Sequence, residues 1–425
     1  MGLIVSKKYL YPTLLASLIL GGFIVFGAQY FRNEHELVAS QTRIIALLEG
    51  LRYREAWLDL KLHGTKLIQR NGPLASRVFR LANDLHQANI VLGSTPIDKD
   101  QGEWDLQRVL LQLEGPQWQD QLEYAMVLAR QHKNQQGQIY ESLVRGSLAR
   151  KNTKDAHQWV IAWKQLEGDI RCDLAEASLH EFTGQGEEAL ESLQKRALSL
   201  APPSPEIEAR AGALFFNMNK PGQAVWHLTK SLELLPDQPD WQLTLAKSMD
   251  LLGQSEQALA LLEKIIAINS KNMEVVAERG RQLLLAGQAS QAIPDLAKVL
   301  ENDPGNVDAA EHLQRALFEM GEEAKAKQWA KKIEKMRTDQ RRLNAIFQML
   351  LPLRPEDPDL MTEAAGIFLR AGQPKSALVW AKKALGIDPN HSVANSLLAG
   401  YYEATGNPGL AAIHKKIAPT KGAQK

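Results

Sequence analysis

Several short motifs in this chain could do chemistry, and each has a competing structural interpretation. Residues 184–189 read Gly-Gln-Gly-Glu-Glu-Ala, which fits the glycine pattern of a dinucleotide-binding turn. That chemistry needs a strand before the turn, so that a helix N-terminus faces the pyrophosphate. The preceding residues 174–182 instead have a helical pattern. We therefore interpret the six residues as a turn between two helices and expect no nucleotide cofactor.

Potential metal ligands lack a suitable spacing. Residues 180–181, His-Glu, begin a zinc-protease-like pair, but glycine stands where the second histidine would be needed. A polar loop contains Asp98, Asp100 and Asp105, as a calcium loop would. Its last ligand position is Val109, which has no carboxylate. We predict no metal site and interpret the loop as a solvated turn.

The sequence also shows no set of residues that would support nucleophilic catalysis. Cys172 is the only cysteine, which excludes an intramolecular disulfide and a zinc site built on paired cysteines. It lies in a helical pattern, so we expect a small buried residue. No nucleophile, base and orienting group can be assembled from neighbouring residues. The chain is therefore predicted not to be an enzyme.

Alanines recur along the C-terminal part of the chain at intervals of 34 or 35 residues, with one interval of 51. The seven alanines are Ala189, Ala224, Ala258, Ala292, Ala326, Ala377 and Ala411. A glycine stands five residues before six of them, at Gly184, Gly253, Gly287, Gly321, Gly372 and Gly406. A fixed period of this size indicates a stacked repeat. Each unit reads as two amphipathic helices joined by a glycine turn.

This pattern resembles the tetratricopeptide repeat (TPR). The best-matched unit carries the signature residues Ala364, Ala365, Phe368, Gly372, Ala377, Ala381 and Pro389. The resemblance covers about residues 137–418 and implies an all-α, right-handed superhelical solenoid of antiparallel helix pairs. It implies a scaffold that binds other proteins and no particular reaction.

The sequence divides into five segments. They are a tail at 1–9, an apolar segment at 10–31, a helical region with degenerate repeats at 32–136, the solenoid at 137–418, and a basic tail at 419–425. Within the solenoid, about residues 334–357 insert half a period without proline or glycine before Leu351. We interpret the insert as an extended second helix or as one extra helix in the stack.

An uncharged segment runs from Leu10 to Phe31, and its 22 residues are long enough to cross a bilayer. We interpret it as an uncleaved transmembrane helix. A cleaved signal peptide is the alternative, although Val25-Phe26-Gly27 matches a cleavage site poorly. Lys7 and Lys8 precede the segment and only Arg32 follows it closely, which predicts an N-terminus in the cytoplasm. The repeats would then lie on the periplasmic side of the inner membrane.

The chain has 50 basic and 49 acidic residues, a balance that does not favour nucleic-acid binding. In TPR proteins, fixed positions of the first helices line a concave groove. The resemblance places the following residues there: Lys247, Asp250, Leu251, Arg281, Leu284, Arg315 and Phe318. This mixture of basic and apolar residues suits an acidic, apolar peptide. Alternatively, the basic row pairs with neighbouring carboxylates such as Asp250 or Glu311 for solubility.

The function these features favour is a membrane-anchored, non-enzymatic TPR scaffold that organises partner proteins at a cell envelope, as in membrane-anchored bacterial TPR proteins. No small-molecule substrate is evident. One alternative is a TPR component of polysaccharide export or cytochrome assembly. Another is an enzyme that uses the solenoid as a substrate-binding arm.

Overall fold

The computed structural model describes residues 36–94, 101–166, 170–195, 198, 200 and 202–418, apart from the side chains of 63–65. The chain divides into two compact units, Met1–Ser248 and Met249–Lys425. The predicted membrane segment and the basic tail lie outside the described residues. None of the helices within the described ranges is both long and apolar enough to cross a membrane.

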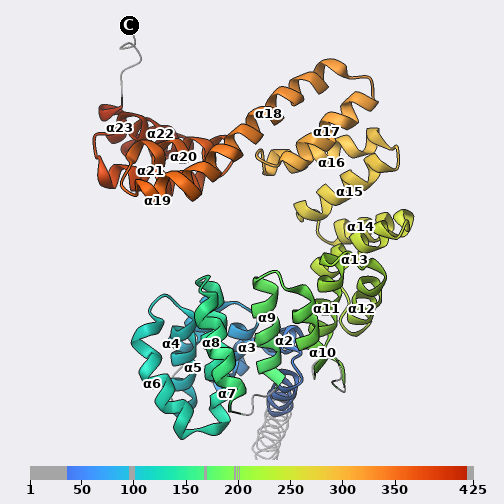
Figure 1. The fold of residues 1–425 in the computed structure, drawn as a ribbon, viewed down its shortest axis with the longest axis vertical. Coiled ribbons are helices and arrows are strands. Elements are labelled where there is room, and N and C mark those ends of the chain that lie inside the picture. The colour runs from blue at the N-terminus through green and yellow to red at the C-terminus, as the bar shows by residue number, and fades with distance from the viewer. Residues whose placement is uncertain are drawn as a thin grey trace, which may run out of the picture. The chain divides into compact units, whose positions relative to one another are not determined.

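The first unit is built from helices throughout the described part of residues 36–248. Residues 36–49 are helical. The elements that follow are α2 (Tyr53–Arg70), α3 (Gly72–Leu81), α4 (Leu85–Ser94), α5 (Gln101–Glu114), α6 (Trp118–Gln131), α7 (Lys133–Ala149), α8 (Thr153–Lys164), α9 (Ile170–Phe182), α10 (Gly186–Lys195), α11 (Pro205–Asn217) and α12 (Pro221–Leu234). Helix α13 (Pro239–Leu251) crosses the boundary between the units. Successive helices pair side by side, as Figure 1 shows for α11 and α12.

The second unit continues the helix pairs. Its elements are α14 (Ser255–Ile268), α15 (Met273–Leu285), α16 (Ala289–Asn302), α17 (Val307–Glu319), α18 (Glu323–Ala345), the π-helix η2 (Ile346–Leu350), α19 (Leu351–Leu353), α20 (Pro358–Arg370), α21 (Pro374–Ile387), α22 (Ser392–Ala404) and α23 (Pro408–Ile417). Of the two interpretations of the inserted half period, the structure has the extended second helix. It is the long helix α18, drawn in orange in Figure 1.

The periodic glycines and alanines take the roles that the spacing predicts. All six glycines have φ between 71° and 77°, the left-handed conformation that ends the first helix of each pair. The seven alanines are buried, with exposed fractions of at most 3%. A larger side chain at these sites would separate the paired helices.

Helix α18 meets α20 through its C-terminal half. Arg370 of α20 donates two hydrogen bonds to Asp339 of α18, at 2.8 and 2.7 Å. Arg342 of α18 forms the same kind of pair with Glu363, at 2.7 and 2.6 Å. The π-helix follows directly, and within it Phe347 packs 4.9 Å, centroid to centroid, from Trp380. These contacts fix the next helix pair beyond the insert.

The first unit also contains a buried network of charges. Arg80 is fully buried and donates to Glu114 at 2.8 Å and to Ser142 at 2.9 Å. Arg145 contacts the other oxygen of Glu114 at 3.3 Å and donates to the Arg80 carbonyl at 3.0 Å. Helices α3, α5 and α7 are thereby joined through one carboxylate.

Candidate functional site

The first helices of the second unit bring part of the predicted row together. Arg281 of α15 donates to Asp250 of α13 at 2.7 Å and to Glu278 of its own helix at 2.5 Å. The hydrogen bond to Glu278, and then that to Asp250, raise the pKa of Arg281 despite its partial burial. Its charge is therefore largely neutralised by neighbours. At this position the structure has the carboxylate pairing that was the alternative interpretation.

The other two basic residues of the row differ from Arg281. Arg315 is 57% exposed and pairs with Glu319 of its own helix at 2.9 Å. Glu311, which could have neutralised Arg315, instead pairs with Arg337 of α18 at 2.5 Å. Lys247 is half-buried in the portion of α13 that belongs to the first unit. Arg315 is the member of the row that the structure leaves most open to a ligand.

The apolar members of the predicted groove separate into exposed and buried side chains. Phe318 is 63% exposed and Leu251 is 55% exposed, as a ligand-binding surface requires. Leu284 is only 1% exposed and packs in the core with Val299 and Leu313. The assignment of Leu284 to the groove is therefore corrected. The neighbouring Leu285 is the exposed large apolar residue of α15, because each step along a helix turns the side chain by about 100°.

A histidine that the sequence analysis did not single out lies beside this row. Burial, followed by the nearby charge of Arg281, lowers the pKa of His312 in α17. The carboxylates of Asp308, Glu278 and Glu311 act in the opposite direction. The histidine is therefore held neutral, and protonation would place a second cation close to Arg281.

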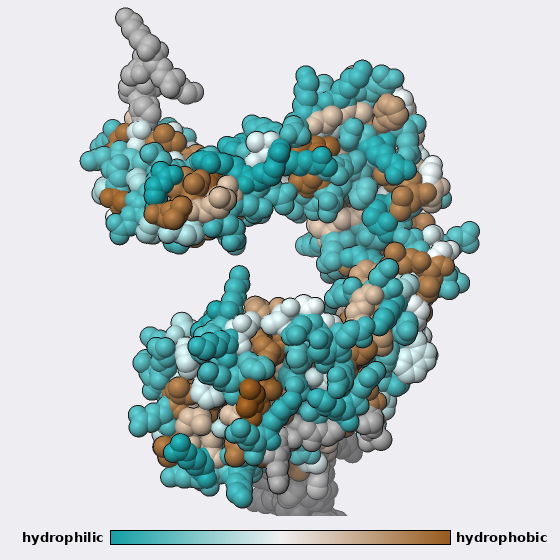
Figure 2. All heavy atoms as spheres, in the orientation of Figure 1, coloured by the Kyte–Doolittle hydropathy of each residue, from teal (hydrophilic) through white to brown (hydrophobic). Residues whose placement is uncertain are grey.

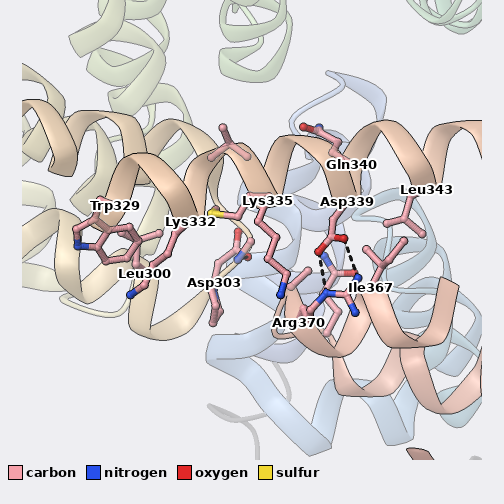
Figure 3. A pocket seen from close by; sticks show the side chains of 16 residues that line it. Leu300, Asp303, Trp329, Lys332, Lys335, Asp339, Gln340, Leu343, Ile367 and Arg370 are labelled. Carbon is pink, nitrogen blue, oxygen red and sulfur yellow. Dashed lines mark hydrogen bonds and ion pairs between the residues drawn. The ribbon is translucent and has the colours of Figure 1, made fainter. Parts of the chain in front are cut away.

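The second unit also contains a pocket that the residue pattern did not reveal. Its volume is about 690 Å³, within the range of about 300–1,000 Å³ common for ligand sites. Helix α18 forms one wall, and the turn between α16 and α17 and the end of α20 form the others (Figure 3). The apolar lining consists of Leu300, Pro304, Val307, Trp329, Met336, Leu343, Ile367 and Ala371.

The charged groups of the pocket are unevenly neutralised. Arg370 and Asp339 form their bidentate pair in its wall, drawn with dashed lines in Figure 3, and this pair lowers the pKa of Asp339. Lys332 lies over the Trp329 ring, 4.3 Å from its centroid. Among the described residues, neither Lys332 nor Lys335 forms an ion pair with a carboxylate. The α18 side of the pocket therefore has a net positive charge and lies next to the apolar lining residues.

The remaining chemical motifs lie in regular helical structure. Gly184 forms the turn between α9 and α10, with a helix before it rather than a strand. Asp105 lies inside α5, so it is not part of a loop as the sequence analysis assumed. Asp98 and Asp100 fall outside the described residues. Within the described ranges, no group of three His, Cys, Asp or Glu side chains could hold a metal ion. Cys172 is buried, as predicted.

The helix pairs, the turn glycines and the buried alanines define an all-α, TPR-like helical repeat protein. Residues 283–350, from α15 to the end of the π-helix, match the family described as tetratricopeptide repeat. No curated protein matches the chain.

Three solved structures match parts of the chain at low identity and low TM-score. A crystal structure of MamA protein is 18% identical with a TM-score of 0.36, over 42% of this chain and 96% of that one. MamA from Desulfovibrio magneticus is 16% identical with a TM-score of 0.29, over 44% and 96%. A tetratricopeptide repeat protein from Parabacteroides merdae is 18% identical with a TM-score of 0.32, over 60% and 94%.

The exposed groove residues could be predicted from the sequence, whereas the pocket could not. The repeat register correctly gives Phe318 and Leu251 as exposed. Two sequence features are related to the pocket. The 51-residue interval marks the insert that creates it, and the eight basic against three acidic residues of α18 account for its positive charge. Both signals are present in the sequence, but only the structure shows that they meet at one cavity. Figure 2 shows that hydrophobic residues on the visible face form separate patches among hydrophilic ones.

Proposed function

We propose that this chain is a non-enzymatic scaffold that binds partner proteins on the first helices of its repeats and is held at a cell envelope by residues 10–31. The TPR-like fold supports a role in protein binding. The uncharged length of residues 10–31 supports the anchor, and the lysines before it support a periplasmic solenoid.

One observation carries this proposal: in the first unit, the N-terminal ends of two first helices, α11 and α13, already bind a helix of the same chain. Asp240, at the position of α13 that faces the groove in the TPR pattern, accepts a 2.7 Å hydrogen bond from Arg54 of α2. Gln238 accepts another from Arg54 at 2.6 Å, and the guanidinium lies 4.5 Å from the centroid of the Trp241 ring. A cation–π contact and charged hydrogen bonds thus recognise one side chain.

The backbone of α2 is held as well. The N–H of Arg54 donates to Glu206 of α11 at 2.6 Å, where the first turn of α2 has no partner within the helix. Ser204 donates to the Leu51 carbonyl at 2.8 Å. Glu206 and Asp240 are 34 residues apart and therefore occupy the same repeat position. Successive first helices thus act together in binding one helix end.

In the second unit, the first helices carry exposed apolar residues at their C-terminal ends, namely Leu251, Leu285 and Phe318. We propose that a partner segment binds there with apolar side chains against Phe318 and acidic side chains toward Arg315. Because Arg281 is already neutralised, apolar contact contributes more to this binding than the basic row does.

The proposal is tested by replacing one exposed apolar residue. The full chain, tagged and purified from membranes of its native host, is compared with Phe318→Asp by quantitative mass spectrometry of co-purifying proteins. Loss of a central apolar contact should lower recovery of a specific partner by about tenfold or more. Ile268→Asp is the matched control, because Ile268 is 72% exposed but lies at the end of a second helix. Equal recovery in all three samples would rule out this face.

A further inference from the structure

We infer that the pocket beside α18 binds an acidic amphipathic helix of a partner protein. This inference rests on the proposed scaffold function but concerns a different surface from the first-helix face around Phe318. The pocket is defined on α18 by Trp329, Lys332, Lys335, Gln340 and Leu343, which Figure 3 labels along that helix.

The origin of the pocket explains why a helix fits it. In the regular part of the second unit, the second helix α16 packs extensively on the first helix of the next repeat, α17. Helix α18 is also a second helix, but the insert displaces the next first helix, α20, toward Asp339 and Arg342. Contacts between α18 and α20 are correspondingly few. The pocket lies against the part of α18 that the next first helix would cover in an uninterrupted repeat.

The dimensions agree with this interpretation. Trp329 and Leu343 are 14 residues apart, which at 1.5 Å per residue corresponds to about 21 Å along α18. A helix of about four turns matches this length. The apolar lining residues Trp329, Met336 and Leu343 recur at intervals of seven, as on the seam between two packed helices.

Charge selects the polar face of the incoming helix. Lys332 and Lys335 line the pocket and form no ion pair among the described residues, although the charge of Lys335 contributes to the lowered pKa of Asp339. The Arg370 charge is compensated by Asp339, and Asp303 adds one carboxylate at the turn between α16 and α17, so the lining as a whole keeps a net positive charge. A helix with an apolar stripe and with glutamates or aspartates beside it would cover the apolar lining of the pocket and pair with both lysines. A basic helix would instead be repelled.

The experiment places a reporter in the pocket. Gln340→Cys is labelled with an environment-sensitive fluorophore, because Gln340 is exposed and lines the pocket while the native Cys172 is buried. The probe is a synthetic helical peptide of about four turns with leucines on one face and glutamates beside them. Its counterpart has lysine at every glutamate position. Gln328→Cys, on an exposed site of α18 outside the pocket, is the control label.

Saturable binding of the acidic peptide should be reported from Gln340→Cys and not from Gln328→Cys. The variant Lys332→Glu/Lys335→Glu should weaken this binding by about tenfold or more, since two attractive contacts become repulsive. The matched variant Lys327→Glu/Lys331→Glu has the same change of charge on the same helix but does not alter the lining, and should change binding by less than about twofold. Thermal unfolding establishes that both variants are folded.

Three results would overturn the inference. They are equal affinity for the acidic and basic peptides, equal weakening by the two double variants, and a saturable response to phosphatidylglycerol vesicles or single-stranded DNA without one to the acidic peptide. None of these results would affect the Phe318→Asp comparison, which tests the scaffold function at the other surface. Conversely, Phe318→Asp could leave partner recovery unchanged while the acidic peptide still binds the pocket. That result would reject the first-helix face and leave the pocket as a separate binding site.

Discussion

Arg281 shows how neighbours determine what a charged residue can do. The repeat pattern places Lys247, Arg281 and Arg315 at equivalent positions, and all three could equally well face a ligand. The spacing of first helices gives that equivalence, and Asp250 is among the carboxylates expected nearby, but the spacing does not show that Asp250 and Glu278 both hold Arg281 in place. Leu284 is a second example, because a repeat position does not specify on which side of α15 the core lies.

The environment of Arg281 leads to a prediction about charge reversal. Arg281→Glu would set a third carboxylate beside Asp250 and Glu278, so we expect a loss of about 1–3 kcal/mol in the free energy of unfolding. Arg315→Glu, at an exposed site, should change stability by less than about 0.5 kcal/mol. Urea denaturation measures both. Equal stability of the two variants would mean that the Arg281 pairs do not persist in solution.

His312 gives a prediction about pH. Its pKa is lowered in the folded state, so between that pKa and the ordinary value of about 6.5 the unfolded chain binds more protons than the folded chain. Stability is therefore lost as the pH falls through this window. His312→Gln should make the loss of stability between about pH 7.5 and about pH 5.5 smaller.

The control for His312→Gln is the exposed His157→Gln in the other unit. Chemical denaturation at each pH gives the comparison. A pH dependence that is the same in the wild type and His312→Gln would contradict the assigned shift.

At the scale of helices, the close packing of the two helices within each repeat could be predicted from the sequence. Departures from regular α-helix could not. The turn glycines and buried alanines follow from the period alone. The π-helix could not be read from residues 346–350, because a change in helix winding has no distinct pattern of apolar residues. The binding of α2 to α11 and α13 was also not predictable, since its partners lie more than 150 residues apart in sequence.

Gly146 tests helix packing directly. A Cβ at this position would lie 2.3 Å from the Leu113 carbonyl oxygen of α5 and 3.0 Å from the Cα of Glu114. Backbone cannot yield as a flexible side chain can, so Gly146→Ala should cost about 1–3 kcal/mol or more. Gly386→Ala, in α21 with open space around it, should instead stabilise by about 0.5–1 kcal/mol. Thermal unfolding of both variants tests the packing of α7 on α5. Similar unfolding midpoints for Gly146→Ala and Gly386→Ala would contradict this packing.

Arg54 tests the binding of α2 within the first unit. Arg54→Ala removes the contacts to Asp240, Gln238 and Trp241, and an exposed ion pair together with a cation–π contact contributes about 1–2 kcal/mol. Hydrogen exchange in the first turn of α2 should accelerate by about tenfold or more. Arg52→Ala is the matched control, because Arg52, the residue directly before α2, pairs with Glu55 of α2 itself and not with α13. Equal exchange in the two variants would show that Arg54 does not hold α2 in place.

At the scale of the whole molecule, the described residues form a series of helix pairs. In the first unit, the N-terminal ends of α11 and α13 hold α2, whereas Phe318 and its neighbours in the second unit are exposed. The class of fold could be predicted from the alanine and glycine spacing. The partner could not, because apolar exposure and paired charges are compatible with many acidic or neutral segments.

The most direct test of the scaffold function is site-specific photo-crosslinking in the native host. A photoreactive amino acid at Phe318 is compared with the same group at Lys264, an exposed residue of the second helix α14. The account predicts a discrete protein adduct from position 318 that is absent from position 264 and lost when Arg315 and Leu285 are changed to Glu and Asp. No adduct from position 318, or the same adduct from both positions, would contradict partner binding on the first-helix face.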